Sequence, residues 1–165
     1  MKSLGELKEN HPVEKAVAVS PPYDLKAGSL RMNEGFNKVY QKRFLDTLKS
    51  KTNLKRVQFP DFPTFTGNSV YDFDDQVTAP VHGFEGADDY YERSSSKHFY
   101  KYVQKPLLII HSKADSLCPL EFAPFNDLKS NTNIRTLFTE SGGLVGFISQ
   151  KRGWLNRTII NFFFF

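Results

Sequence analysis

The chain has little cysteine and no pattern that depends on it. Cys118 is the single cysteine among 165 residues, so no internal disulfide can form and a reducing compartment is expected. Cysteine and histidine are nowhere paired at metal-ligand spacing, so we expect no metal and no cofactor. Internal repeats are also absent from the sequence, which excludes solenoid and propeller architectures.

Long apolar segments are lacking as well. The first ten residues, MKSLGELKEN, have no apolar core and do not form a signal peptide pattern. The longest apolar run, IINFFFF at the end of the chain, is too short for a bilayer, which needs about 20 residues. We therefore expect no transmembrane segment and a cytoplasmic location, with peripheral association with a membrane left open.

Of two neighbouring segments, one has few acidic residues and the other has no basic residue. Lys26 to Arg56 contains nine Lys or Arg residues and two acids, whereas Asp61 to Glu92 contains eight acids and no Lys or Arg. Such segments can pair with each other or be solvated separately. A nucleic-acid interface needs basic residues and aromatics together on one face, and we expect no nucleic-acid partner.

Three short apolar segments predict strands. Ala16 to Val19 ends at Ser20-Pro21-Pro22, which cannot continue a ladder. Leu107 to Ile110 is continuously apolar, as in a parallel strand buried on both faces, and Asn133 to Thr139 reads as a third strand. Because strands alternate with helical stretches, the sequence predicts an α/β fold with a parallel sheet.

Spacings of three and four residues predict helices. One amphipathic helix with a basic outer face follows from Phe36, Val39, Tyr40, Phe44 and Leu48. It is either the outer layer of a domain or a helix that lies on a membrane surface. Acids at 88–89 favour the start of a second helix, and 79–80 is expected to be a loop. A third helix would place on one face Trp154, Leu155, Thr158, Ile159 and Phe162.

Two loops follow the second and third predicted strands, where open α/β sheets carry their active residues. The first loop, HSKADSLCP, contains Asp115, and the second, ESGGLVGF, contains Gly142-Gly143 followed by Leu144. An acid after the penultimate strand and a histidine after the last are the second and third members of an α/β-hydrolase triad, in the chain order Ser, Asp, His.

Four segments carry a resemblance to a known family: VAVSPPYDL, YDFDDQVTAPVHGFEGADDYY, KPLLIIHSKADSLCP and GGLVGFIS. They resemble the YheT-like branch of the α/β-hydrolases, which are predicted esterases and lipases. The resemblance begins near Leu4 and corresponds to roughly the C-terminal half of the family's domain. It implies one partial domain over 1–165, with a parallel sheet remnant of about three strands flanked by helices and a cap-like helical insertion over 26–104.

The same resemblance implies a carboxylic-ester hydrolase with a serine nucleophile and an ester or lipid substrate. Asp115 falls on the position of the triad acid, and Leu144 occupies the position of the triad histidine, where it cannot carry a proton. No Gly-X-Ser-X-Gly nucleophile elbow is present in the 165 residues. We therefore expect this chain alone to be inactive.

Other polar residues have simpler explanations. Ser20 ends a strand but lacks flanking glycines and precedes two prolines. Cys118 is expected to be a small buried hydrophobe, and Asp115 has the alternative of a solvated loop residue that caps the next helix. None of the four histidines lies in the loop that would carry the base, namely His11, His82, His98 and His111.

Two non-catalytic interpretations stay open. One is a binding or interaction module that self-associates through the exposed edge of its first strand. The other is a truncated gene product without a function.

Overall fold

The chain divides into two compact units. A computed structural model describes residues 1–143 and 153–164. The first unit, here called the sheet unit, comprises Met1–Tyr23 and Ser96–Phe165, and the second, the helical unit, comprises Asp24–Ser95. The insertion was expected over 26–104. In the structure, residues 96–104 belong to the sheet unit, where Tyr100 and Val103 lie in the core.

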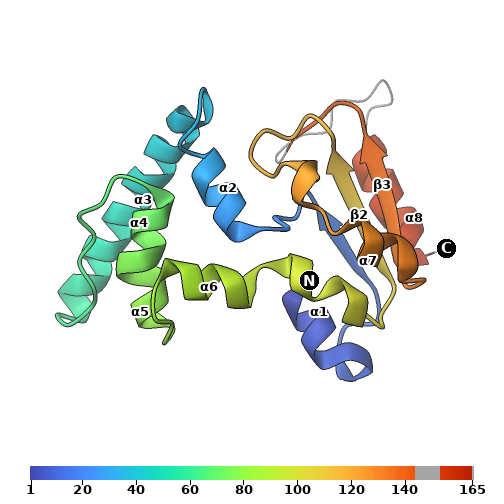
Figure 1. The fold of residues 1–165 in the computed structure, drawn as a ribbon, viewed down its shortest axis with the longest axis horizontal. Coiled ribbons are helices and arrows are strands. Elements are labelled where there is room, and N and C mark those ends of the chain that lie inside the picture. The colour runs from blue at the N-terminus through green and yellow to red at the C-terminus, as the bar shows by residue number, and fades with distance from the viewer. Residues whose placement is uncertain (144–152, 165) are drawn as a thin grey trace. The chain divides into compact units, whose positions relative to one another are not determined.

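Three parallel strands form the sheet, in the order β1-β2-β3 (Figure 1). They are β1 (Ala16–Val19), β2 (Leu107–Ser112) and β3 (Ile134–Thr139). Every residue of β2 is buried, whereas β1 is only half-buried. The prediction of an α/β fold with a small parallel sheet is therefore confirmed, because β2 has the two-sided burial that its continuous apolar run indicated.

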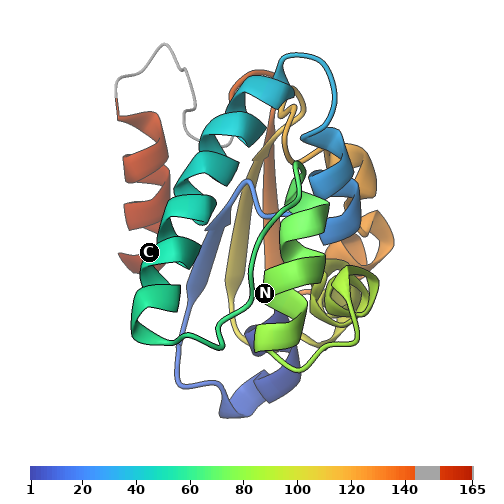
Figure 2. The ribbon, with the colours of Figure 1, turned by 90° about the vertical axis from the view of Figure 1, so that its left-hand side faces the viewer.

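The main core of the sheet unit lies on one face of the sheet. Side chains alternate along a strand, so Leu107 and Ile109 share this face, which is covered by α1 (Lys2–Leu7), η4 (Tyr100–Tyr102) and α7 (Phe125–Ser130). Figure 2 shows α8 on the side of the sheet opposite to α7. The buried core cluster consists of Leu4, Tyr23, Tyr100, Val103, Leu107, Ile109, Ala123, Leu128 and Ile134.

The last helix packs through the face that its spacing predicts. Helix α8 spans Trp154–Phe164. The Lys15 ammonium donates hydrogen bonds to the carbonyl oxygens of Phe162 (3.3 Å) and Phe163 (3.1 Å) near the end of this helix. Half-buried positions alternate with exposed ones at helical spacing, and they are the five predicted residues Trp154, Leu155, Thr158, Ile159 and Phe162.

The helical unit has a run of helices and no strand. Its elements are α2 (Leu25–Arg31), α3 (Asn37–Gln58), α4 (Val70–Phe73), the π-helical turn η2 (Asp74–Thr78), α5 (Ala79–Val81) and α6 (Ala87–Ser94). Side chains cap two of the starts, because Asp24 accepts from the N–H of Ala27 and Ser69 forms a capping box with Asp72. Helix α6 begins next to the acids at 88–89, as predicted.

Residues 79–80 are helical, so the prediction of a loop there is wrong. They open α5, which continues directly from η2. Pro80 stands in the first turn of α5, where a helix leaves the backbone N–H without an intrahelical partner in any case. Proline therefore does not interrupt the chain of helices from α4 to α5.

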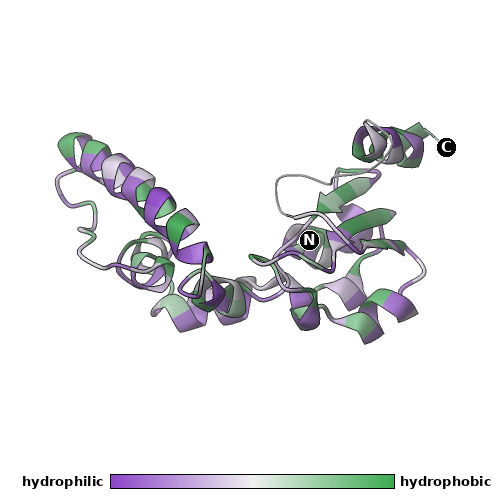
Figure 3. Cartoon of the chain, turned by 90° about the horizontal axis from the view of Figure 1, so that it is seen from above, coloured by the Kyte–Doolittle hydropathy of each residue, from purple (hydrophilic) through white to green (hydrophobic). Residues whose placement is uncertain are grey.

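Helix α3 is present and longer than its apolar spacing indicated, but its orientation is not the expected one. Phe36, Val39, Tyr40 and Phe44 are exposed. The buried positions are instead Asn37, Gln41, Leu45 and Thr52. Figure 3 shows hydrophobic and hydrophilic positions interspersed along this helix. The interpretation of the aromatic stripe as the packed face is therefore wrong. Within the part of the chain that the structure describes, no helix is long and apolar enough to cross a membrane.

Candidate functional site

Asp115 is buried in the loop that follows β2, with only 5% of its surface exposed. The backbone N–H groups of Leu117 and Cys118 donate to its Oδ1 over 3.0 and 2.9 Å. This side-chain-to-backbone turn is typical of aspartate and explains why the loop can reverse directly after the strand. Its Oδ2 is buried and has no hydrogen-bond partner among the described residues.

The alternative of a solvated aspartate does not fit this environment. Asp115 caps the backbone of its own loop from a buried position, and its backbone N–H donates to the carbonyl of Ser112 at the end of β2 (3.2 Å). One oxygen of this carboxylate is thus fixed by two N–H groups, and the second is buried and can still accept a hydrogen bond.

His111 lies at the carboxyl end of β2 and is fully buried. Its Nε2 is 2.7 Å from the carbonyl oxygen of Cys118. Because a carbonyl can only accept, Nε2 carries a hydrogen atom and donates. The Tyr23 ring stacks on the imidazole, with 5.2 Å between the ring centroids. Neither His111 Nδ1 nor the Tyr23 hydroxyl has a hydrogen-bond partner within the described ranges, and the same holds for Asp115 Oδ2 and Ser20 Oγ.

Ser20 follows β1 at the same end of the sheet. Its N–H donates to the carbonyl of Ile110 (2.8 Å), and its side chain is almost fully buried. Its φ of 45° is rare for a residue other than glycine. The local sequence carries no signal for this conformation. Pro21-Pro22 follow, and the next helix begins at Leu25, so the strand does not pass directly into a helix as in a nucleophile elbow.

Cys118 is not poised as a nucleophile. Burial raises the pKa of its thiol to about 12, and the negative charge of Asp115 adds to this shift. At neutral pH the side chain is therefore a neutral thiol, and the reactive species of cysteine is the thiolate. This agrees with the expectation that Cys118 acts as a small hydrophobe, although its side chain is half-buried rather than fully enclosed.

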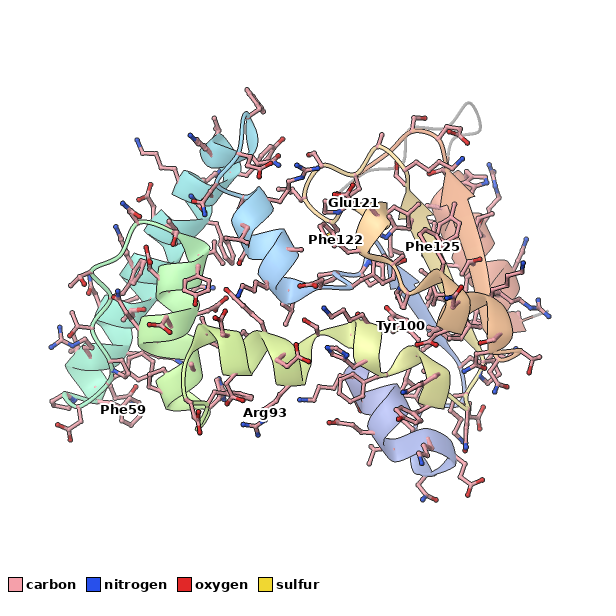
Figure 4. All side chains as sticks on the ribbon, in the orientation of Figure 1. Phe59, Arg93, Tyr100, Glu121, Phe122 and Phe125 are labelled. Carbon is pink, nitrogen blue, oxygen red and sulfur yellow. The ribbon has the colours of Figure 1, made fainter. Side chains whose placement is uncertain are left out.

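The segment after Asp115 packs back onto the sheet. Figure 4 shows Phe122 and Phe125 along the stretch that leads from this loop into α7, and Tyr100 on η4. The ring of Phe125 meets that of Phe138 on β3 edge to face, with 6.0 Å between centroids. The loop of Asp115 is thus held between β2 and an anchored helix.

The second predicted loop is described only in its first part. Gly142 has a φ of 134°, a conformation that glycine adopts far more readily than other residues, and the chain bends directly before it, at residues 140–141. Leu144, which is predicted to occupy the position of the triad histidine, lies outside the described residues.

The other histidines lie apart from Asp115 in sequence and in their contacts. His11 bonds the hydroxyl of Ser3 (2.9 Å), and His82 ends α5 in the helical unit. Over residues 1–143 and 153–164, no three His, Cys, Asp or Glu side chains come together in a way that could hold a metal ion.

The sequence has curated relatives that match most of its length. YheT of Escherichia coli, a predicted esterase, is 35% identical over 158 residues, which cover 90% of this chain and 46% of that protein. A monoacylglycerol lipase of Saccharomyces cerevisiae is 27% identical (91% and 36%), and human phospholipase ABHD3 is 28% identical (88% and 37%). No family model matches the chain, and no solved structure matches it.

A parallel sheet flanked by helices, with a buried aspartate in the loop after its central strand, is consistent with part of an α/β-hydrolase fold. Together with these relatives, which match most of the chain, it supports an α/β-hydrolase esterase family. The chain spans less than half the length of the curated relatives named above.

Proposed function

We propose that this chain carries the acid of a serine-type carboxylic-ester hydrolase and that the acid is Asp115. The observation that supports this most is the carboxylate itself, fixed at Oδ1 by two backbone N–H groups and buried at Oδ2 without a partner among the described residues. In a triad the acid orients the imidazole and stabilises its cation. The names of the relatives, an esterase, a monoacylglycerol lipase and a phospholipase, support an ester or lipid substrate.

These 165 residues do not hydrolyse esters by themselves. They contain no Gly-X-Ser-X-Gly elbow, and the leucine at 144 cannot take a proton from a serine. Triad members act as a unit, since loss of the serine or the histidine of a protease costs roughly 10⁶ in turnover. The chain alone should therefore show only the background rate.

A serine-directed fluorophosphonate probe and a short-chain p-nitrophenyl ester test this inactivity. We expect neither labelling nor turnover above buffer. Ser20→Ala is the informative variant because Ser20 is the buried serine at the carboxyl end of β1. Labelling of the wild-type chain that disappears in Ser20→Ala would identify a nucleophile and overturn the proposed inactivity.

The position of the acid can be tested without any catalysis. Leu144→His introduces an imidazole where the resemblance places the base, and an NMR titration measures its pKa. A neighbouring carboxylate stabilises the imidazolium, so we expect a pKa about one unit or more above the ordinary value near 6.5. The matched variant Leu144→His with Asp115→Asn should lose this increase. Equal pKa values in the two variants would remove Asp115 from the acid position.

A second candidate function is self-association through the edge of β1. On one side β1 pairs with β2, and no strand of the described residues pairs with the other side. The N–H groups of Ala16 and Ser20 donate to Pro106 (2.9 Å) and Ile110 (2.8 Å). Because donors alternate along a strand, those of Val17 and Val19 face the unpaired edge, which can template pairing with another strand.

Val17→Pro tests this edge selectively. Proline removes the Val17 donor while leaving the donors of Ala16 and Ser20, and edge positions tolerate proline. If the edge mediates self-association, sedimentation velocity should show a dimer for the wild-type chain and for Val17→Thr, and a monomer for Val17→Pro. A wild-type chain that is monomeric over the whole concentration range would exclude this function.

A further inference from the structure

Helix α3 has an apolar face that points away from its own unit. Phe36, Leu54 and Val57 are 77%, 70% and 84% exposed, and Val39 and Tyr40 are also exposed. Leu54 follows Phe36 by about five helical turns of 3.6 residues, so it returns to the same face. Val57 similarly returns to the face of Val39. The exposed apolar face therefore runs along the whole helix rather than forming one isolated spot.

The opposite face of α3 combines the buried Leu45 with polar side chains that form hydrogen bonds. Gln41 donates through Nε2 to Asn33 Oδ1 (2.8 Å) and accepts at Oε1 from the N–H of Val70 (3.4 Å). The Thr52 hydroxyl donates to the carbonyl of Leu48 (2.9 Å). Turning the helix to bury its aromatics would break the bonds of Gln41 and expose Leu45, so the apolar face is fixed outward.

The charge of α3 is almost entirely positive. Asp46 is its single acid, and its basic residues are Lys38, Lys42, Arg43, Lys49, Lys51, Lys55 and Arg56. Two of them lie over aromatic rings, with Lys49 5.3 Å from the Phe65 centroid and Lys55 5.0 Å from that of Phe62. Lys42, Arg43 and Lys51 are exposed. Basic side chains thus accompany the apolar face along its length.

We propose that α3 binds an anionic lipid surface. Exposed aromatic and aliphatic side chains can enter the boundary between headgroups and acyl chains, while the lysines and Arg43 meet the negative headgroups. A second copy of this chain suits the face less well, because two copies would bring the same excess of positive charge together. This proposal does not depend on whether the chain hydrolyses an ester.

The charge contribution is tested by flotation of the 165-residue chain with phosphatidylcholine vesicles, with and without phosphatidylglycerol. We expect binding only when phosphatidylglycerol is present. The triple variant Lys42→Gln, Arg43→Gln, Lys51→Gln should lose about fivefold in partition coefficient for each charge, or on the order of a hundredfold together. The control Lys101→Gln, Lys129→Gln, Arg135→Gln removes the same charge from the sheet unit and should retain most of the binding.

The apolar contribution is tested by Leu54→Ser with Val57→Ser, against Leu7→Ser with Ile160→Ser as a control that removes exposed apolar side chains elsewhere. Only the first pair should weaken flotation, and far-UV circular dichroism should show that both pairs keep the wild-type helix content. Three results would each overturn the proposal. The first is no flotation with anionic vesicles, and the second is equal flotation with neutral and anionic vesicles. The third is a wild-type dimer that Leu54→Ser with Val57→Ser dissociates without changing flotation.

Discussion

The central strand of the sheet unit and the longest helix of the helical unit bury different kinds of side chain. In the sheet unit, β2 buries apolar side chains on both of its faces, with Leu107 and Ile109 on one and Leu108 and Ile110 on the other. In the helical unit, α3 buries Asn37, Gln41 and Thr52 and leaves its aromatics outside. Hydrophobic burial is non-directional, whereas buried polar groups must find partners of correct geometry. The burial of β2 can therefore be inferred from apolar periodicity, and the inward face of α3 cannot.

A half-buried carboxylate, that of Asp74, lies at the centre of a polar network in the helical unit. Asp74 accepts from the hydroxyl of Tyr91 and from that of Thr78, both over 2.7 Å. Burial raises the pKa of Asp74, and these two hydrogen bonds oppose the increase. The neighbouring Asp75 accepts from the N–H of Ala87 (2.9 Å) at the start of α6. Directed contacts thus connect η2 to α6.

The largest difference between the units should come from deleting a buried apolar group. Ile109 is fully buried, so Ile109→Ala should reduce the free energy of unfolding of the sheet unit by about 2–5 kcal/mol. Trp154 is the single tryptophan and lies half-buried on α8, so urea titration followed by its fluorescence reports on the sheet unit. The exposed Ile160→Ala is the control and should change stability by less than about 0.5 kcal/mol. Equal effects of the two variants would mean that β2 is not the core strand.

A polar deletion should matter more in the helical unit than in the sheet unit. Tyr91→Phe removes the hydroxyl that a buried tyrosine donates to the half-buried Asp74 carboxylate, which should destabilise the helical unit by about 1–3 kcal/mol. Urea titration followed by far-UV circular dichroism measures this change, because the helical unit contains the longest helix. The exposed Tyr40→Phe should be neutral. A shift of the Trp154 transition that matches the shift in circular dichroism would contradict separate stabilisation of the two units.

The Asp74 network should also make stability depend on pH in a defined direction. Its folded pKa lies above the unfolded value near 3.9. The folded state therefore binds the extra proton in this interval, and stability falls as pH rises from about 4 through the folded pKa. Asp74→Asn should lack this fall. Urea titrations at several pH values, with the variant subtracted from the wild type, isolate it.

The variant must be subtracted because other acidic residues change stability with pH in the opposite direction. The pKa of Asp72 is lowered, chiefly by its hydrogen bond with Ser69, so its contribution to stability is lost as pH falls. Since Asp72 is present in both proteins, its contribution cancels. If the free energy of unfolding of the wild type rises relative to that of Asp74→Asn between about pH 4 and 6, the two hydrogen bonds affect the pKa of Asp74 more than burial does.

Features that apolar side chains determine could be predicted from the sequence, and features that depend on polar contacts could not. The three strands and the packed face of α8 could be predicted because apolar side chains decide them. The inward face of α3 could not, because Gln41 bonds with Asn33 and Val70, and no residue spacing reveals such partners. At the candidate site, the location of Asp115 after β2 followed from topology. The stacking of Tyr23 on His111 and the φ of Ser20 depend on chain segments that meet only in the folded protein.

The smallest expected effect also tests most directly which face of α3 points outward. Leu54→Gln replaces an exposed apolar side chain on α3, and its effect on stability should stay within about 0.5 kcal/mol. Leu45→Gln changes the same residue type on the same helix but at a buried position, so it should cost several times more, because an amide would lose its water without a prepared partner. Urea titration followed by circular dichroism compares the two. If Leu54→Gln were as costly as Leu45→Gln, the apolar face would be buried within this chain and would be closed to a lipid surface.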